Sequence, residues 1–448
     1  MTAKTSLKTR LGFGAGEFSS SIFFTVTSFW LMNFLTDEIR LSAALAGTAL
    51  LVGKIWDAVI DPFIGYFSDR TKTRWGRRRP YILWFTIPFA ISFVVLFTNP
   101  GIQAQTGKFI WVMLIYMLLC TVYSLTNIPY NALLPEMTDD YNERTSISGF
   151  KQMFAVLGTL LGAGAALPLM NLFPTRTLGF IGMSAIFAVL LAISLFVTFF
   201  SVRERLQNIQ PVTLKIWDSL KCLFNNRPYV LLLTAWFTNS TAVAIAESML
   251  IYYYKYIFQN EGAVTLAMIS LLIATIVTFP MWVWMAKKIG KKTSYILGMS
   301  LTILVILIIA FGADVLGING TLVLMVVAGV GFGSHYVLPW AMAPDTIDYD
   351  YVKTGVRQEG IYYSAWTFVI ALGGALAGFL VGQGLNLFGY IPEVAQSARS
   401  ILGIRLLIGP LPAVLFLLGN LALAFYPLTR KRYEEVQAAI RKRETGKN

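Results

Sequence analysis

The chain contains long apolar stretches that recur along its whole length. Most of them exceed about 18 residues, which is the length that an α-helix needs to cross the hydrocarbon core of a bilayer. Only 13% of the residues are charged, whereas a typical soluble protein carries about 25%. A transmembrane β-barrel would instead need segments of about ten residues with alternating polarity. The sequence therefore predicts an all-α polytopic membrane protein.

Twelve transmembrane helices are expected, in two six-helix halves. The first six lie near residues 11–36, 41–69, 80–98, 108–136, 145–172 and 177–202, and the second six lie near 228–258, 263–286, 293–312, 320–344, 359–388 and 403–427. The chain thus divides into an N-terminal six-helix bundle (1–202), a cytoplasmic linker (203–227), and a C-terminal six-helix bundle with a cytoplasmic tail (228–448). In the linker, Val212–Phe224 has the pattern of an interfacial helix. Two such halves are typical of secondary transporters, which hold their substrate near the midplane.

The positive charges indicate the orientation of the chain. Most of the 36 Lys and Arg residues fall at the termini and in alternate loops, so the positive-inside rule places both termini in the cytoplasm. The basic loop Arg70–Arg79 is too short for a nucleic-acid-binding domain, but its charges suit anionic lipid headgroups. The sequence has no phosphate loop, metal-ligand spacing or nucleophile with a base, so we expect neither an enzyme nor a cofactor.

Two acids inside the second span carry the clearest chemical signal. Asp57 and Asp61 are four residues apart and therefore lie on one face of a helix. A carboxylate inside a membrane is costly unless it faces protein, water or a cation, so this pair is typical of a site for Na⁺ or a proton. Lys54 lies on the same face and leaves a second interpretation open, a buried ion-pair stripe without a transported ion.

Charged residues also gather where spans end on the predicted cytoplasmic side. Opposed charges at such positions suit a gate, because their salt bridges would form in one state of a two-state transporter and break in the other. The predicted cytoplasmic gate consists of Asp69, Arg70, Glu136, Arg144, Asp345, Asp348 and Arg357. The alternative is a solvated charged loop that contributes little energy.

Four motifs, in order along the chain, carry a resemblance to a known family. They are the DxxxDP element at Asp57, Asp61 and Pro62, the SDRT and GRRRP segments of the following loop, NIPY at 127–130, and PDTIDYDYVKTGVRQEG at 344–360. Together they resemble the glycoside-pentoside-hexuronide:cation symporters, the melibiose permease-like family of the major facilitator superfamily. The likeness extends over essentially the whole chain. It implies the major facilitator fold and cation-coupled symport of a sugar, glycoside or uronide.

The resemblance also implies roles for individual residues. Asp57, Asp61 and Ser124 match the family's cation-binding positions, so the coupling cation is H⁺ or Na⁺, with a sodium ion expected at Asp57 and Asp61 if Na⁺ is used. Glu17 and Lys151 match an acidic and a basic sugar-binding position, and a carboxylate with an ammonium suits a hydroxylated solute. A structural ion pair between helices is the alternative for these two residues.

Three further substrate-binding candidates follow from the same comparison. Asn127 stands where the family has a sugar-binding Asp, and Tyr336 stands where it has a Trp that stacks on the sugar. His335, the single histidine of the sequence, lies beside Tyr336 and is expected to contact substrate or relay protons, with a satisfied core histidine as the alternative. Ala371 replaces a family Lys and Ile60 replaces an Asn between the two acids, so the site differs from the melibiose type, and the acid pair favours a shared proton over Na⁺.

The resulting hypothesis is a secondary active symporter that works by alternating access. Its expected partners are a small-molecule solute and membrane lipids, its expected location is the bacterial inner membrane, and we expect it to function as a monomer. Two alternatives remain at this point. A lysolipid symporter of the same superfamily would have a substrate cavity lined by apolar side chains, and a sensor that retained the fold would bind substrate without transporting it.

Overall fold

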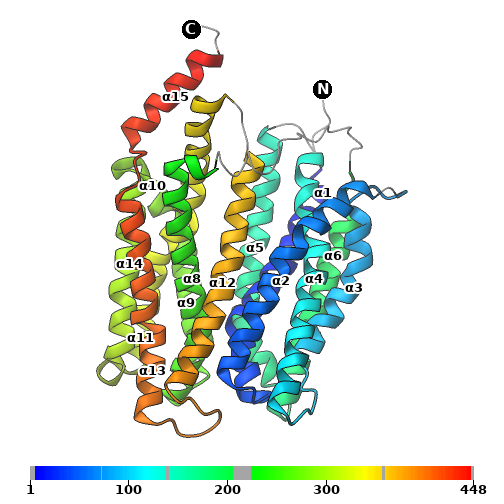
Figure 1. The fold of residues 1–448 in the computed structure, drawn as a ribbon, viewed down its shortest axis with the longest axis vertical. Helices are drawn as coiled ribbons and strands as arrows, with labels where there is room; N and C mark the ends of the chain where they lie inside the picture. Colours follow the sequence, from blue (N-terminus) through cyan, green and yellow to red (C-terminus); the bar gives the residue numbers. More distant parts are fainter. Residues whose placement is uncertain (1–5, 72, 138–140, 205–222, 356–358, 445–448) are drawn as a thin grey trace. The chain divides into compact units, whose positions relative to one another are not determined.

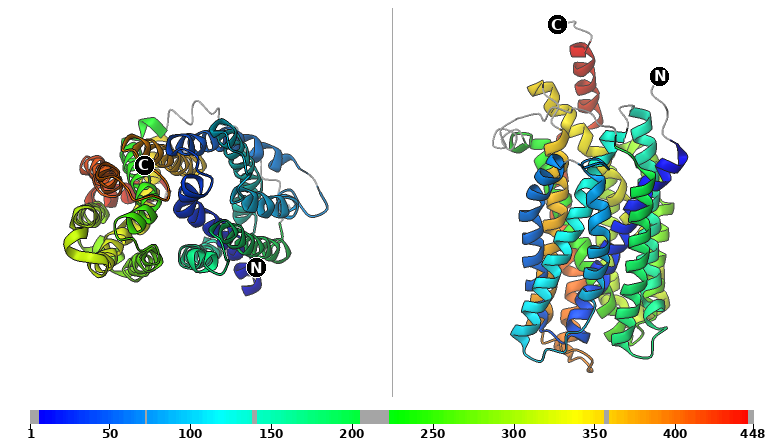
Figure 2. Two further views of the ribbon diagram at one scale, coloured as in Figure 1. Left: turned by 90° about the horizontal axis from the view of Figure 1, so that it is seen from below. Right: turned by 90° about the vertical axis from the view of Figure 1, so that its right-hand side faces the viewer.

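The computed structural model consists of long helices joined by short turns (Figure 1). It describes residues 6–71, 73–137, 141–204, 223–355 and 359–444. Within each part of the molecule the helices run side by side along a common direction, as the end-on view shows (Figure 2). The prediction of an all-helical chain with membrane-spanning helices is therefore confirmed.

The chain divides into two compact units. The N-terminal unit comprises Met1–Gln210 with Gly378–Ser397, and the C-terminal unit comprises Pro211–Ala377 with Ala398–Asn448. The division after residue 210 falls inside the linker expected at 203–227. Most of the predicted interfacial helix Val212–Phe224 lies outside the described residues.

Besides the end of α12, the N-terminal unit contains six helical segments, and three of them begin at a recognisable cap. The hydroxyls of Ser6, Ser42 and Thr175 accept hydrogen bonds from backbone N–H groups in the first turns of α1, α2 and α6. The segments are α1 (Leu7–Val26), which continues through the π-helical η1 (Thr27–Leu31) and η2 (Phe34–Glu38), then α2 (Ala43–Arg70), α3 (Arg79–Leu96), α4 (Gln105–Met137), α5 (Tyr141–Met170) and α6 (Arg176–Ser201).

The C-terminal unit contains helices that are bent or interrupted at several points. Its elements are α8 (Arg227–Tyr256), α9 (Ala263–Val277), α10 (Phe279–Ile289), α11 (Lys291–Thr354), α12 (Glu359–Leu387, shared with the N-terminal unit), α13 (Ala398–Ile408), α14 (Pro410–Ala424) and α15 (Arg430–Glu444). Proline at the start of α10 and of α14 marks the breaks after α9 and α13. The sequence reasoning assigned 428–448 only to a tail and missed α15.

Nine helices among the described residues are long and apolar enough to cross a membrane, and α9 with α10, bent by 44°, makes a tenth if the pair is one span. The long α11 is two helices joined at Gly317, where a φ of 61° interrupts the helical path between the predicted spans 293–312 and 320–344. The predicted span 11–36 corresponds to α1 with η1 and η2, outside those nine. The twelve expected spans are matched only when both arms of α11 and this first segment are counted.

The assignment of Gly378–Ser397 to the N-terminal unit has a local cause. A Cβ on Gly382 would lie 2.3 Å from the carbonyl oxygen of Ala43, and one on Gly47 would lie 2.6 Å from that of Gly378. Glycine at these positions therefore lets α12 approach the start of α2. The hydroxyl of Tyr390 then donates a 2.5 Å hydrogen bond to Asp37. The end of α12 and the loop after it are thus attached to the N-terminal unit.

Candidate cation and solute sites

Asp57 lies at the centre of a polar cluster between α2 and α4. Its side chain is buried, with only 6% of the residue exposed. Lys54 Nζ donates to Asp57 Oδ2 at 3.1 Å, and Ser124 Oγ donates to Asp57 Oδ1 at 3.0 Å. Burial without these partners would be very costly for a carboxylate, so the two donors compensate the burial and hold the Asp57 side chain in place. The structure therefore brings Asp57 and Ser124 together, and their part in binding a cation stays a prediction.

Asp61 differs from Asp57 in having an unused oxygen. Its Oδ1 is buried and has no hydrogen-bond partner among the described residues. Asp57 and Lys54 both act on Asp61 electrostatically, with opposite signs. A buried, unpartnered carboxylate oxygen close to a second carboxylate and to the Ser124 hydroxyl can receive a proton or a hard cation, since both prefer oxygen donors. The residues present therefore fit either coupling cation.

Glu17 and Lys151 form the second polar cluster, which joins α1, α4 and α5. Their ion pair measures 3.2 Å, and the side chains are 22% and 26% exposed. Lys151 Nζ also donates to Asn131 Oδ1 at 2.6 Å. Asn131 Nδ2 donates to Asn127 Oδ1 at 2.8 Å, and Asn127 Nδ2 donates to Ser20 Oγ at 2.8 Å. Three predicted solute residues therefore lie in one hydrogen-bonded chain.

This series of hydrogen-bonded side chains includes two residues that the sequence reasoning did not select, Asn131 and Ser20. Asn131 bridges Lys151 to Asn127, and Ser20 ends the chain on α1. The missed signal was the spacing on α4, where Ser124, Asn127 and Asn131 follow one another at intervals of three and four residues. Such residues share one helical face. The same face of α4 therefore reaches Asp57 at one end and Lys151 at the other.

Aromatic packing fixes the position of α1 beside this cluster. The Tyr130 hydroxyl donates to the Phe13 carbonyl at 2.8 Å, and the two rings stack with centroids 4.8 Å apart. A Cβ on Gly16 would lie 2.4 Å from the Tyr130 ring, so α1 can approach this closely only with glycine there. The Lys151 ammonium lies 5.6 Å from the centre of the same ring. Tyr130 thus holds both α1 and the lysine.

The two C-terminal candidates lie in different surroundings. His335 is 3% exposed, its Nδ1 lies 3.0 Å from the Tyr295 hydroxyl, and its ring stacks on Trp236. Asn239 donates to the same hydroxyl at 2.8 Å. These contacts match the alternative of a satisfied core histidine. Tyr336, by contrast, is 39% exposed, and its role in stacking on a sugar stays a prediction.

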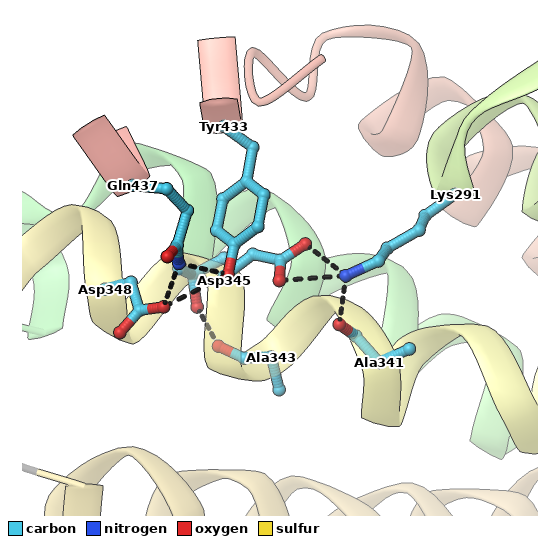
Figure 3. Close-up of polar contacts among 8 residues, drawn as sticks. Lys291, Ala341, Ala343, Asp345, Asp348, Tyr433 and Gln437 are labelled. Carbon is cyan, nitrogen blue, oxygen red and sulfur yellow. Dashed lines mark hydrogen bonds and ion pairs between the residues drawn. The ribbon is translucent and has the colours of Figure 1, made fainter. Parts of the chain in front are cut away.

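Two predicted gate acids are held by partners within the C-terminal unit (Figure 3). Lys291 Nζ donates to both oxygens of Asp345, at 2.8 and 2.6 Å. Asp348 Oδ2 accepts hydrogen bonds from the Tyr433 hydroxyl at 3.1 Å and from Gln437 Nε2 at 3.0 Å. Tyr433 and Gln437 belong to α15, so the unpredicted helix is tied to the end of α11. The sequence reasoning did not predict Lys291 as the partner of Asp345, nor the C-terminal tail as the partner of Asp348.

The remaining gate residues are on α2, α4 and α5, except Arg357, which lies outside the described residues. Arg70 donates to the Tyr66 carbonyl at 3.4 Å, and its guanidinium lies 3.4 Å from the centre of the Tyr66 ring. The other four, Asp69, Glu136, Arg144 and Arg357, lie outside the residues whose side chains the structure describes. Their part in a gate stays a prediction.

The basic loop after α2 is fastened by an acid that the sequence reasoning missed. Both carboxylate oxygens of Glu204 accept hydrogen bonds from the consecutive backbone N–H groups of Arg77, Arg78 and Arg79, at 2.6, 2.8 and 2.7 Å. Gly76 has a φ of 109°, and a Cβ there would meet the same carboxylate at 2.4 Å. The loop and the end of α6 are therefore joined by charge-assisted hydrogen bonds.

Comparisons with known proteins place the chain among transporters. A profile of the family described as MFS/sugar transport protein matches residues 12–430. The isoprimeverose transporter of Lactiplantibacillus pentosus is 34% identical over 94% of this chain and 88% of its own length. The glucuronide carrier protein homolog of Escherichia coli (strain K12) is 31% identical over 98% of this chain and 96% of its own. The putative sulfoquinovose importer of the same strain is 31% identical, with coverages of 99% and 95%.

Solved structures are similar in fold at low sequence identity. The nucleoside transporter NupG superposes with a TM-score of 0.61 and 14% identity, over 96% of this chain and 99% of its own. A bacterial homologue of the human lysosomal transporter Spinster superposes with a TM-score of 0.67 and 11% identity, over 97% of each chain. The chain therefore belongs to the MFS/sugar transport protein family, among the glycoside-pentoside-hexuronide symporters, and is an integral membrane transporter rather than an enzyme.

Proposed function

We propose that the protein is a secondary active transporter that couples entry of a sugar, glycoside or uronide to H⁺ or Na⁺ and works by alternating access of its two units. Relatives named for isoprimeverose, a glucuronide and sulfoquinovose support this class of solute. No covalent step is needed, because the energy comes from the cation gradient.

The solute would bind at the cluster of Glu17, Lys151 and Asn127. The carboxylate accepts hydrogen bonds from sugar hydroxyls, the ammonium donates them, and the amide does both. The 3.2 Å ion pair is only partly buried. Glu17 and Lys151 can therefore separate from each other and bind solute hydroxyls without either charge being fully desolvated. From the family resemblance, we also propose Tyr336 as an aromatic face for the sugar ring and His335 as a further solute contact.

The cation would bind between Asp57 and Asp61, with Ser124 as a third oxygen donor. The unpartnered Oδ1 of Asp61 is the available position, since both oxygens of Asp57 already accept hydrogen bonds from Lys54 and Ser124. Two neighbouring carboxylates share a proton readily, which favours H⁺. Coordination by carboxylate and hydroxyl oxygens would serve Na⁺ in the same place.

The observation that supports coupling most directly is the shared face of α4. Ser124 contacts the cation cluster, whereas Asn127 and Asn131 contact the solute cluster one and two turns further along. A shift or rotation of α4 that improves one set of contacts must therefore move the other set. Occupancy of either cluster would change the affinity of the other by the same factor, which is the linkage that symport requires.

The remaining assignments follow from the sequence and the relatives. We propose that both termini are cytoplasmic, that the basic loop touches anionic lipid, that the protein resides in a bacterial inner membrane and that the monomer is the working unit. A relative is itself named as an inner membrane symporter. The predicted gate residues would close the cytoplasmic side, with Asp345 and Asp348 also held by Lys291 and α15.

A thermal-shift screen of the purified protein tests this proposal. Monosaccharides, disaccharides, glycosides, uronates and lysolipids are each added with and without Na⁺ at two pH values, because a ligand that binds the folded state raises its apparent stability. Stabilisation by a sugar, glycoside or uronate that Na⁺ or low pH strengthens is expected. The Lys151→Ala variant should lose the part of this stabilisation that depends on Na⁺ or low pH.

Two results of the same screen would refute the proposal. Stabilisation by lysolipids alone would make the protein an amphiphile symporter. Stabilisation by a sugar without any uptake into proteoliposomes would make it a sensor.

A further inference from the structure

A polar cavity of about 470 Å³ lies in the N-terminal unit, away from both clusters described above. It is located where η2 ends and α2 begins, which is the end of α2 opposite to the basic loop. Its walls come from the turn before α2, the loop before α4, the start of α6 and the loop after α12. The lining residues are Asp37, Glu38, Ile39, Arg40, Asn99, Gly101, Ile102, Gln103, Lys108, Thr177 and Glu393.

Lys108 is the unusual member of this lining. The residue is only 9% exposed, although lysine is almost always at the surface unless it is paired. Its one polar contact among the described residues is to the Arg40 carbonyl, at a long 3.4 Å. An ammonium group has three N–H donors, so at least two have no acceptor in the part of the chain that the structure describes. A buried ammonium with unused donors on a polar cavity is what a ligand with oxygen acceptors requires.

The backbone around Lys108 is held rigidly. Arg40 has a φ of 54°, in the left-handed region that residues with a side chain rarely adopt. Gln105 keeps it there, since its Nε2 donates to the Arg40 carbonyl at 2.8 Å and its Oε1 accepts from the Ser42 N–H at 2.9 Å. On the adjacent wall Asn99 donates to the Glu38 carbonyl at 3.2 Å. The cavity is thus preformed, which lowers the entropic cost of binding a ligand.

The other charges of the cavity indicate which ligand it takes. Asp37 already accepts hydrogen bonds from Asn33, Thr36 and Tyr390. The carboxylate of Glu38 accepts one from Thr177 at 2.9 Å. Three carboxylates of the lining, Asp37, Glu38 and Glu393, outnumber its two cations, Arg40 and Lys108, so phosphate or another dianion would be repelled more strongly than a singly charged ligand. A lining of ammonium, amide, hydroxyl and carboxylate groups instead matches a polyhydroxylated ring, whose hydroxyls both donate and accept.

We propose that this cavity is a second solute site, at which a sugar or uronate binds through Lys108 before it reaches the cluster of Glu17 and Lys151. The inference rests on the proposed function, because it assumes the same class of solute. A carboxylate on the solute would pair with the Lys108 ammonium, so a uronate should bind here more tightly than the neutral sugar of the same shape.

Ligand-observed NMR on the full-length protein in detergent tests this inference, with methyl glucuronide and methyl glucoside as the probes. Saturation transfer to each probe is measured for the wild type, for Lys151→Ala, and for Lys151→Ala combined with Lys108→Gln. Lys151→Ala combined with Lys8→Gln is the matched control, because Lys8 is an exposed lysine of α1 that does not line this cavity. Thermal unfolding of each variant establishes that it is folded.

The site predicts that Lys151→Ala retains binding of the glucuronide, that the added Lys108→Gln lowers its affinity roughly tenfold or more, and that Lys8→Gln leaves it unchanged. Gln103→Leu, at the rim, replaces Lys108→Gln if that variant does not fold, and should weaken both probes. Complete loss of binding in Lys151→Ala, or equal binding with and without Lys108→Gln, would overturn the second site alone. Absence of binding to the wild type, together with a screen in which no sugar stabilises it, would overturn the proposed function as well.

Discussion

Replacing Asp57 by Asn should damage stability and coupling together, whereas replacing Asp61 should damage coupling alone. Asp57 neutralises the Lys54 ammonium at 3.1 Å, and the two side chains are only 8% and 12% exposed. In Asp57→Asn, the amide keeps one hydrogen bond but the buried ammonium loses the carboxylate that contacts it. Breaking a buried ion pair from one side costs about 3–5 kcal/mol, mostly as the penalty of the charge left behind.

This cost converts into a measurable shift in the unfolding temperature. A unit of this size loses about 2–4 °C for each kcal/mol, so Asp57→Asn should unfold roughly 6–20 °C below the wild type. Asp61→Asn removes a carboxylate whose Oδ1 has no hydrogen-bond partner within the described segments and which interacts with a second negative charge, Asp57. Its unfolding should therefore change by less than about 1 kcal/mol. Tryptophan fluorescence during heating of the detergent-solubilised protein measures both.

A double variant separates the charge effect from any change of shape. Lys54→Met combined with Asp57→Asn removes both charges and should recover most of the lost stability while remaining uncoupled. Equal unfolding temperatures for Asp57→Asn and the wild type would refute the reasoning. So would a double variant that is no more stable than Asp57→Asn.

Three further predictions concern packing and loops. Gly382→Ala places a Cβ 2.3 Å from the Ala43 carbonyl oxygen and should destabilise the protein by about 1–3 kcal/mol in thermal unfolding. Gly374→Ala is the control and should not destabilise it, because no atom lies within 4 Å of a Cβ at that position. Equal effects of the two substitutions would contradict the close approach of α12. Glu204→Gln weakens three charge-assisted hydrogen bonds and should make the basic loop several-fold more sensitive to trypsin. An unchanged cleavage rate would show that the carboxylate does not hold the loop. Tyr433→Phe removes one hydrogen bond to Asp348 and should speed hydrogen exchange in α15 without affecting solute binding; unaltered exchange would mean that this bond does not hold the helix.

The elements that could be predicted from sequence are those with a local signal. Apolar stretches of membrane-spanning length indicated most helices, and the interval of four residues placed Asp57 and Asp61 on one face. The interruption near Gly317 was also visible, because the apolar pattern stops there. Helices such as α2 begin after an N-cap residue, here Ser42, and such residues can be recognised in the sequence.

The residues that sequence reasoning missed depend on contacts between distant segments. Glu204 binds a loop 125 to 127 residues away, and Tyr390 reaches Asp37 across 353 residues. No local sequence pattern indicates a partner so far away along the chain. Asn131 is a different case, because its interval from Asn127 was visible, but an asparagine in an otherwise apolar helix could equally have faced another helix. The helix α15 was missed since its charged composition lacks the apolar stretch that marked the others.

The central claim is that a cation gradient drives the solute through this protein by way of Asp61. The most direct test is solute accumulation in proteoliposomes under an imposed inward Na⁺ or proton gradient, with the solute that the thermal-shift screen identifies. The wild type should accumulate the solute above the outside concentration until an ionophore collapses the gradient, whereas Asp61→Asn should exchange labelled for unlabelled solute without accumulating it. Accumulation by Asp61→Asn equal to that of the wild type, or mere equilibration by the wild type under both gradients, would contradict the account.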